Sequence, residues 1–383
     1  MRLYYEWGTR QIHKKGEELC GDSIAVSRHP HSVTLALSDG LGSGVKANIL
    51  ATLTTRIAMS LLENELPLGE VVQTLSETLP VDKVRKMAYS TFAIAQFFSH
   101  GRARVVEFDS PPVVFLHDRR MQPVVHEEKT VGGKTIREYV LELAVGDWIV
   151  FVSDGVINAG IGGVYPLGWG WEQLARYLEA QAHGDLTADD LADKAAETVQ
   201  ELYAGPPGDD VSIVVIKCRR KLVATVLTGP PIDRSRDEAT VHGFVSRQGR
   251  LAVCGGTTAQ IVARHLGQPL EVELETMTAD VPPMGRLEGV DMVSEGILTL
   301  TKVSQLLSSG AQRKQVRFCN DGASSLLRLL LEMDHVHFMV GLAVNPAHQN
   351  PDLPHVLGIR MAVVREIAEE LRKRGKEVSI EEL

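Results

Sequence analysis

The chain has 383 residues, of which 44% are hydrophobic and 23% charged, and its formal net charge is −9. This length is enough for about two domains, each with a sizeable core. The negative charge argues against a general nucleic-acid or anionic-membrane surface, because both associations rest on positive charge. We therefore expect proteins or small molecules as partners, with no nucleic acid and no membrane.

The N-terminal residues lack the apolar core of a signal peptide, and no stretch approaches the roughly 18 apolar residues that a membrane span needs. We therefore expect a cytoplasmic protein. The four cysteines are far apart in the sequence and form no Cys-x-x-Cys pair. Their spacing predicts neither a disulfide framework nor a zinc site.

An apolar strand that ends in an acidic turn is the first chemical feature along the chain. Val33, Leu35 and Leu37 alternate with smaller or polar residues, which predicts a strand with one buried face that ends at Asp39. Glycines follow at every second position, so the Gly40 carbonyl is free to turn toward a cation that Asp39 binds. An isolated copy of this motif is better explained as a tight turn with an exposed aspartate.

Three further acidic turns follow the same pattern. Asp22 precedes the strand at 24–26, the apolar run 148–152 leads directly into Asp154, and Asp209 and Asp210 open the strand at 211–216. Four such turns indicate carboxylates gathered at one end of a sheet structure. Mg²⁺ and Mn²⁺ prefer oxygen ligands of this kind, whereas Zn²⁺ more often uses His or Cys.

The elements between these turns predict a sandwich of antiparallel sheets flanked by helices. Apolar residues at helical spacing predict a long amphipathic helix over 45–62, and a second helix runs from Leu68 to Pro80. Thr187-x-x-Asp190 resembles a capping box at the start of a later helix. The expected strands are 90–98, 102–108, 112–117, 138–143 and 148–152, and the expected later helices are 171–180 and 187–203.

Near residue 220 the pattern changes, and we place a domain boundary between 1–220 and 221–383. The second part predicts a smaller α/β or α+β domain with strands at 251–254 and 336–344 and helices through Leu266 and over 361–374. Thr257 or Thr258 is expected as a helix N-cap rather than as part of an anion site. Asp291, Glu295 and the histidines nearby are expected at scattered positions, and no metal is assigned there.

Taken in order, the acidic motifs resemble a known family. The order Gly-Asp, Ser-Asp-Gly-x-Gly-x-Gly-x-x-Ala, Ser-Asp-Gly-Val and Gly-Asp-Asp-x-Ser is similar to the bacterial PPM (PP2C-type) serine/threonine phosphatases of the sporulation stage II protein E branch. The resemblance covers about residues 1–220 and implies an α-β-β-α sandwich. No family is identified for residues 221–383. The match is carried by residues 20–22, 38–47, 153–156 and 208–213.

The resemblance implies two Mn²⁺ or Mg²⁺ ions that share a water molecule, which attacks the phosphorus of phosphoserine or phosphothreonine. Asp39 would bridge both ions, Asp22 and the Gly40 carbonyl would hold one of them, and Asp154 and Asp209 would hold the other. Asp210 is the less favoured ligand of its pair. A basic residue ahead of Asp22 would meet the substrate phosphate, or these residues form a solvated basic loop. The basic residues concerned are Arg10, His13, Lys14 and Lys15.

One departure from the family pattern is Leu41, which stands where many members have a histidine that assists the leaving group. Leu or Met is usual there in the bacterial branch, so the general acid stays unnamed. The expected activity is a phosphoprotein phosphatase in bacterial signalling, with a substrate such as an anti-sigma factor antagonist-like regulator. The alternatives are a phosphatase-fold sensor or scaffold that acts by binding through residues 221–383, and a small-molecule phosphomonoesterase. The second domain would have a regulatory or substrate-recruiting role.

Overall fold

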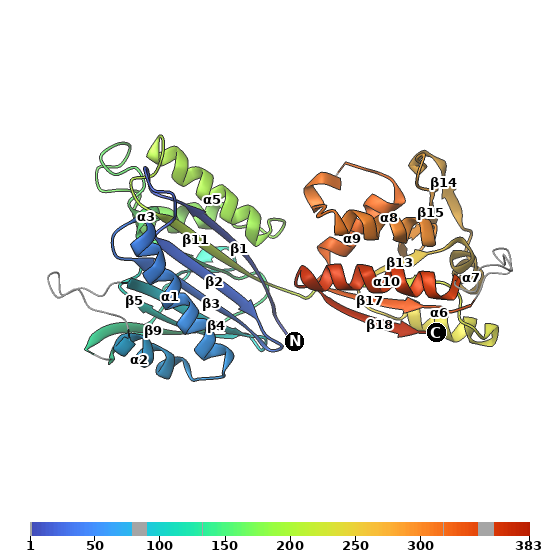
Figure 1. Cartoon of the computed structure of the whole chain (residues 1–383), viewed down its shortest axis with the longest axis horizontal. Coiled ribbons are helices and arrows are strands. Elements are labelled where there is room, and N and C mark those ends of the chain that lie inside the picture. Colours follow the sequence, from blue (N-terminus) through green and yellow to red (C-terminus); the bar gives the residue numbers. More distant parts are fainter. Residues whose placement is uncertain (1, 79–89, 132, 317, 344–355) are drawn as a thin grey trace. The chain divides into compact units, whose positions relative to one another are not determined.

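The computed structural model describes residues 2–78, 90–131, 133–316, 318–343 and 356–383. The chain divides after Arg220 into two compact units, Met1–Arg220 and Lys221–Leu383 (Figure 1). Within these described ranges, no helix combines the length and the apolar character that crossing a membrane requires.

The first unit is a sandwich of two antiparallel sheets, as the sequence predicted. One sheet has the order β1-β11-β10-β6-β7 and the other the order β2-β3-β4-β5-β9-β8. The strands at 90–98, 102–108 and 148–152 have the predicted bounds. The strands are β1 (Tyr4–Ile12), β2 (Asp22–Arg28), β3 (Ser32–Gly40), β4 (Ser90–Phe98), β5 (Arg102–Phe108), β6 (Val114–His117), β7 (Arg120–Met121), β8 (His126–Val131), β9 (Lys134–Glu142), β10 (Trp148–Val152) and β11 (Val211–Arg219).

Helices cover both outer faces of this sandwich (Figure 1). Helices α1 (Gly44–Glu63) and α2 (Leu68–Thr78) pack on the six-stranded sheet, and α4 (Trp171–Gln181) and α5 (Ala188–Tyr203) pack on the other. The predicted capping box at the start of α5 is confirmed, because the Thr187 hydroxyl accepts from the Asp190 backbone and the Asp190 carboxylate accepts from the Thr187 backbone. The predicted end of the second helix at Pro80 lies outside the described residues. This α+β layering confirms the predicted fold class.

Strand β3 differs from its prediction because both of its faces are buried, not one. Leu35 and Leu37 face the core between the sheets, while Ala36 on the other face lies under α1 and α2. Helix α1 packs through small residues such as Ala47 and Ala51. Its apolar spacing predicted that Val45, Ile49 and Leu53 would be buried, and this is wrong because all three are exposed. Small side chains at the contact allow the helix to lie close to the strand.

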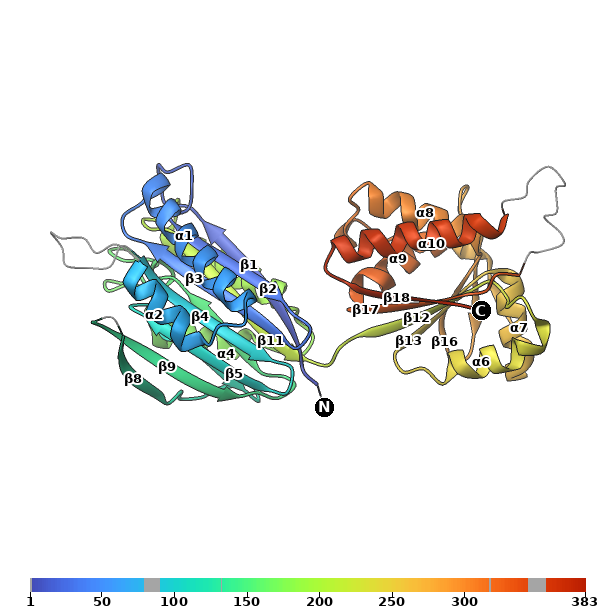
Figure 2. The same cartoon turned by 60° about the horizontal axis from the view of Figure 1, so that its bottom comes forward.

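The second unit is a doubly wound α/β domain. Its sheet has the order β14-β15-β16-β13-β12-β17-β18, in which the five strands from β16 to β18 are parallel. Helices α6 and α7 lie on one face, and α8, α9 and α10 on the other (Figure 2). The elements are β12 (Val223–Thr228), α6 (Asp237–Val245), β13 (Arg250–Cys254), α7 (Gly256–Leu266), β14 (Glu271–Glu273), β15 (Met284–Leu287), β16 (Val290–Ser294), α8 (Ile297–Ser308), α9 (Gly322–Glu332), β17 (His335–Val340), α10 (Val356–Lys373) and β18 (Glu377–Glu382).

Two local predictions for the second unit need correction. Helix α7 begins at Gly256, with Gly255 at the N-cap, so neither Thr257 nor Thr258 caps it. Gly255 has φ of 136°, a backbone angle that side chains rarely tolerate, and the helix starts two or three residues earlier than expected. Strand β17 ends at Val340, before the predicted end at residue 344, which lies outside the described residues.

Four of the six polar residues that drew attention in the second unit have structural partners, while His348 and His355 lie outside the described residues. The Glu295 carboxylate accepts from the backbone of Leu298 at 2.9 Å and so caps α8, and Asp291 pairs with Arg250. His335 and His337 both contact the Ser379 hydroxyl, at 2.9 and 2.7 Å. These contacts explain the residues without a metal.

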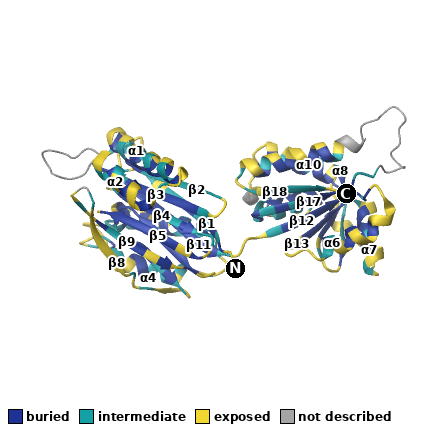
Figure 3. Cartoon of the chain, turned by 90° about the horizontal axis from the view of Figure 1, so that it is seen from below, coloured by how far each residue is buried: buried dark blue, intermediate teal, exposed yellow. Residues whose placement is uncertain are grey.

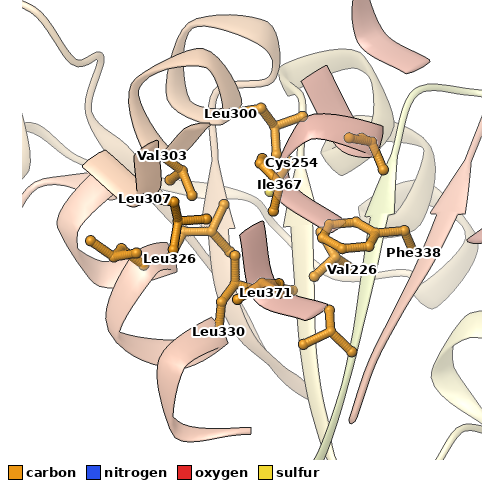
Figure 4. Packing of buried hydrophobic residues seen from close by; sticks show 14 of the residues in the cluster. Val226, Cys254, Leu300, Val303, Leu307, Leu326, Leu330, Phe338, Ile367 and Leu371 are labelled. Atoms are coloured by element: carbon orange, nitrogen blue, oxygen red, sulfur yellow. The ribbon is translucent and has the colours of Figure 1, made fainter. Parts of the chain in front are cut away.

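Each unit has its own buried core (Figure 3). In the second unit, the Phe338 ring lies among Val226, Leu330 and Leu371 from a strand and two helices (Figure 4). All four tryptophans, at positions 7, 148, 169 and 171, belong to the first unit. Tryptophan fluorescence therefore reports unfolding of the first unit, while far-UV circular dichroism reports both.

We expect Phe338→Ala to destabilise the second unit by about 3–5 kcal/mol, because it removes a fully buried ring and leaves a cavity. Urea unfolding of the full chain should then show an earlier loss of circular dichroism with an unchanged midpoint of tryptophan fluorescence. Phe318→Ala is the matched control, since that ring is 87% exposed and its loss should shift neither signal. An equal shift of both signals for Phe338→Ala would show that the two units do not unfold separately.

Candidate metal centre

Two carboxylates come from the end of the six-stranded sheet. Asp22 is the first residue of β2 and Asp39 is the last but one of β3, and the two lie directly opposite each other in the antiparallel pairing. Directly opposed residues lie on the same face of a sheet. Ile24 and Leu37, two residues along each strand on that face, pack into the core between the sheets. Both aspartates therefore lie at the end of the inner space of the sandwich.

The other sheet brings two more carboxylates to the same end. Asp154 follows β10 by two residues and starts the short helix α3 (Asp154–Ile157), while Asp209 lies two residues before β11. These strands are antiparallel neighbours, with Val152 opposite Ile213, so the turn after one meets the turn before the other. The Tyr203 hydroxyl fixes this turn by donating to the Gly155 carbonyl at 2.7 Å.

The electrostatics of the four carboxylates show that they are neighbours across the two sheets. Burial raises the pKa of Asp39 well above its usual range, and the negative charges of Asp22, Asp154 and Asp209 raise it further. Burial also raises the pKa of Asp22, with a smaller contribution from Asp210. The pKa of Asp154 is raised by partial burial and by Asp209. Carboxylates placed in this way repel one another unless protons or cations compensate their charge.

Asp22 gives the clearest sign of a missing ligand. Its residue is 3% exposed, and within the described ranges neither of its carboxylate oxygens has a hydrogen-bond partner of acceptable geometry. Burying a carboxylate without compensation is costly, so such groups are normally paired or coordinate a metal. The donor set of oxygens alone fits Mg²⁺ or Mn²⁺ better than Zn²⁺.

The four carboxylates do not form a closed coordination shell as they stand. Among the residues that the structure describes, no three His, Cys, Asp or Glu side chains are grouped tightly enough to enclose an ion. Burial and the negative charges of neighbouring carboxylates raise the pKa values of Asp39 and Asp154, as expected for a site whose charge a cation would compensate. The residue types and their positions at the strand ends therefore fit a divalent cation such as Mg²⁺ or Mn²⁺.

The backbone around Gly40 is held firmly beside this cluster. The Ser90 hydroxyl donates to the Asp39 carbonyl at 3.0 Å, and Gly40 pairs with Ser90 at the end of the sheet. A Cβ atom at Gly40 would overlap the backbone of Ala47 in α1. Glycine at this position therefore lets α1 begin directly above the strand that carries Asp39.

The basic residues near the N-terminus have separate roles. The sequence left two alternatives for Arg10, a solvated basic loop or a phosphate-binding residue. Arg10 lies in β1 and pairs with Asp189 and Asp193 on α5. The alternative of a solvated basic loop is therefore wrong for Arg10, because β1 spans Tyr4–Ile12. Lys14 does reach the cluster: its ammonium lies 3.5 Å from the Asp209 carboxylate.

Asp209 and Asp210 occupy different surroundings, which sequence alone did not separate. Asp209 has a side chain that is 40% exposed and faces Lys14 and Asp154. Asp210 is buried, and its carboxylate accepts from the Lys14 backbone at 2.9 Å. Asp210 therefore holds the N-terminal segment in place, while Asp209 stays available to a ligand.

The first unit is similar to known proteins in sequence and in fold. Residues 29–219 match the family model described as stage II sporulation protein E (SpoIIE). No curated protein sequence matches the chain. Three solved structures illustrate the similarity in fold, all below 25% identity.

The first is the PP2C phosphatase domain with a fragment of the regulatory domain of SpoIIE from Bacillus subtilis, at 19% identity, 57% coverage of this chain, 64% of that chain and a TM-score of 0.48. The second comprises the RsbU and RsbW domains of a Mycobacterium tuberculosis protein, at 16% identity, coverage of 63% and 69%, and a TM-score of 0.49. The third is RsbX in complex with magnesium, at 13% identity, coverage of 56% and 95%, and a TM-score of 0.43. The chain thus spans slightly less than two thirds of the first of these structures.

The family match covers β3 to β11 and three of the four acidic turns, and the predicted resemblance is confirmed. Through its first unit, this chain belongs to the SpoIIE family of PP2C-like domains.

Proposed function

We propose that the first unit is a metal-dependent serine/threonine phosphatase that acts on a phosphorylated protein. The observation that carries this proposal is the buried carboxylate of Asp22, which lies opposite Asp39 and whose oxygens make no hydrogen bond of normal geometry in the described chain. The Ser212 and Ser153 hydroxyls nearby lower the pKa of this carboxyl group but do not offset the effect of burial. The membership in a PP2C-like family supports the same reaction. A bacterial signalling regulator, such as an anti-sigma factor antagonist-like protein, is the substrate class that the family resemblance favours.

Each carboxylate has a definite part in this proposal. Asp39 would bind both of two Mn²⁺ or Mg²⁺ ions. Asp22 and the Gly40 carbonyl would be further ligands of one ion, and Asp154 and Asp209 would be ligands of the other. When bound, such ions neutralise phosphoryl oxygens and lower the pKa of water. The chain itself positions four negative charges at the end of the sandwich.

The surroundings of the carboxylates also bear on the substrate. Lys14 adds a positive charge at the Asp209 side, where it can attract a phosphate dianion. Leu41 has no titratable group, so it cannot act as the general acid for the leaving oxygen.

The direct test is hydrolysis of p-nitrophenyl phosphate and of a phosphothreonine peptide, with and without Mn²⁺. Metal-dependent turnover of both substrates would support the phosphatase. Turnover of the small ester alone would favour a small-molecule phosphomonoesterase. Metal binding without turnover of either would favour the sensor or scaffold alternative, in which binding through residues 221–383 is the function.

We expect divalent cations to stabilise the protein more at pH 8 than at pH 5.5. Because the folded-state pKa values of Asp22, Asp39 and Asp154 are raised above the unfolded value, the stability that these groups contribute is complete below about pH 4 and is lost as the pH rises. A bound cation offsets that loss. At a hundredfold excess over its dissociation constant it adds about 2.7 kcal/mol, or roughly 5–10 °C in melting temperature.

Thermal unfolding monitored by tryptophan fluorescence checks this expectation with Mn²⁺, Mg²⁺ and the chelator EDTA at both pH values. Ca²⁺ and Na⁺ at matched ionic strength control for screening. A cation effect of equal size at pH 5.5 and pH 8 would argue that the carboxylates are not its source.

The second unit has the strand order of a doubly wound domain, which supports many unrelated functions. We propose a regulatory or substrate-recruiting role for it, on the basis that it is compact and follows the phosphatase unit directly. Deleting residues 221–383 and comparing turnover of p-nitrophenyl phosphate with that of a protein substrate would separate these two roles.

A further inference from the structure

A groove runs from the metal centre along the open edge of the six-stranded sheet. Strand β2 is the outermost strand of that sheet and pairs only with β3. A cavity of about 500 Å³ is lined by six successive residues of this strand, 22–27. Successive residues of a strand point to opposite faces, so a cavity that touches all six must follow the edge of the strand.

One face of helix α1 forms the opposite wall. Asn48, Thr52, Arg56, Met59 and Glu63 line the cavity at helical spacing. The helix and the strand run in the same direction, because Asn48 donates to the Cys20 carbonyl at one end and Thr55 contacts Ser23 farther along. The wall from residue 48 to residue 63 is about 22 Å long, which matches six or seven residues of extended chain.

The backbone of β2 is available to a partner along this edge. The Gln11 side chain donates to the Asp22 carbonyl at 3.3 Å, so that carbonyl points away from β3. Because alternate residues of an antiparallel strand point the same way, the backbone groups of Ile24 and Val26 also face the groove. Nine of the thirteen lining residues are polar, as suits a bound backbone rather than an apolar ligand.

Two charged side chains lie free in the groove. Arg56 and Glu63 are exposed, and neither forms an ion pair within the described part of the chain. Arg56 follows Thr55, which contacts Ser23, so Arg56 lies about 5 Å along the groove from Asp22, or one to two residues of extended chain. A ligand that starts at the metal centre would therefore present the second residue beyond its phosphorylated residue to Arg56.

We propose that this groove binds the segment of the phosphoprotein substrate next to its phosphorylated residue, as an extended strand added to β2, with an acidic side chain two positions from the phosphorylated residue contacting Arg56. Adding a strand to a free sheet edge is a general mode of peptide recognition. The groove ends at Asp22, so the bound segment leads the phosphate directly to the carboxylates. This inference rests on the proposed phosphatase function.

The test uses the full chain with Mn²⁺ and ten-residue phosphoserine peptides that carry Asp or Lys two positions to either side of the phosphoserine. We expect kcat/KM to be about fivefold higher for an Asp peptide than for its Lys counterpart, which is the size of an exposed ion pair. Arg56→Glu should reverse this preference, and Arg176→Glu, the same change on exposed α4, should leave it as in the wild type.

A second variant tests the strand edge. Val26→Pro removes an outward N–H and should lower kcat/KM for every peptide about tenfold, while p-nitrophenyl phosphate turnover stays within twofold of the wild type. Normal turnover of that ester, with peptide kinetics unaffected by Arg56→Glu and Val26→Pro, would overturn the groove and leave the phosphatase standing. Absence of metal-dependent turnover of the ester by the wild type would overturn the proposed function and this inference together.

Discussion

Asp39→Asn is expected to reduce metal-dependent phosphatase turnover at least 10³-fold, which corresponds to about 4 kcal/mol of transition-state stabilisation. Asp39 is the carboxylate that feels the charges of three others, Asp22, Asp154 and Asp209, so it is the position from which both proposed ions are reached. An amide keeps the shape of the side chain but lacks the negative charge. The measurement is kcat/KM for p-nitrophenyl phosphate in Mn²⁺.

The same substitution should raise the stability of the metal-free protein. Removing one of several repelling carboxylates is expected to add about 1 kcal/mol at pH 8, or roughly 2–4 °C in melting temperature. This opposite sign excludes unfolding as the cause of lost activity. Asp118→Asn is the matched control, because that side chain is 90% exposed and should change neither quantity. Full activity in Asp39→Asn would refute the assigned role.

Gly40→Ala is expected to destabilise the first unit by about 3 kcal/mol. The added methyl would overlap the backbone of Ala47, and helix α1 can relieve the overlap only by moving as a whole away from β3. Because backbone atoms rather than a flexible side chain are in the way, the site has no inexpensive adjustment. Urea unfolding followed by tryptophan fluorescence measures the loss.

Gly69→Ala provides the contrasting control. Gly69 lies in the first turn of α2, and a Cβ there would meet nothing within 4 Å. Alanine favours a helix over glycine, so this variant should gain about 0.5–1 kcal/mol. If Gly40→Ala were as stable as the wild type, α1 would not be packed as closely on β3 as the structure shows.

The sandwich could be predicted from the sequence because its strands alternate cleanly and its acidic turns have a fixed order. The strand ending at Asp39 and the helix opening at Thr187 depend on local patterns, and local patterns are what a sequence displays. Strand β1 was missed because its polar residues resemble a loop in the sequence, whereas in the fold Arg10 pairs with α5 and Gln11 donates to the Asp22 carbonyl and the Ser212 hydroxyl. The exposure of Val45 and Ile49 was missed because apolar spacing alone does not show that alanines make the contact.

The candidate site, like the fold, could be predicted from the sequence only in part. The residue types and their positions at strand ends were available from the sequence, and so was the preference for Asp209 over Asp210 as a proposal. What the sequence lacked was the pairing across sheets: the register that sets Asp22 opposite Asp39, and the ion pairs that occupy Arg10 but leave Lys14 beside Asp209. Such contacts join residues up to 195 positions apart, which no local pattern encodes.

Because β2 lies at the edge of its sheet, the backbone that carries Asp22 opens more easily than that of Asp39, which lies between β2 and β4. An edge strand is held by one ladder of hydrogen bonds, so it can fray without unfolding of the sandwich, and its outward amides should exchange with deuterium early. A ligand that Asp22 holds binds only when β2 is paired with β3, so its binding opposes fraying of the strand. Slower exchange at Ile24 and Val26 on addition of Mn²⁺ would therefore report ligand binding residue by residue, in the absence of any substrate.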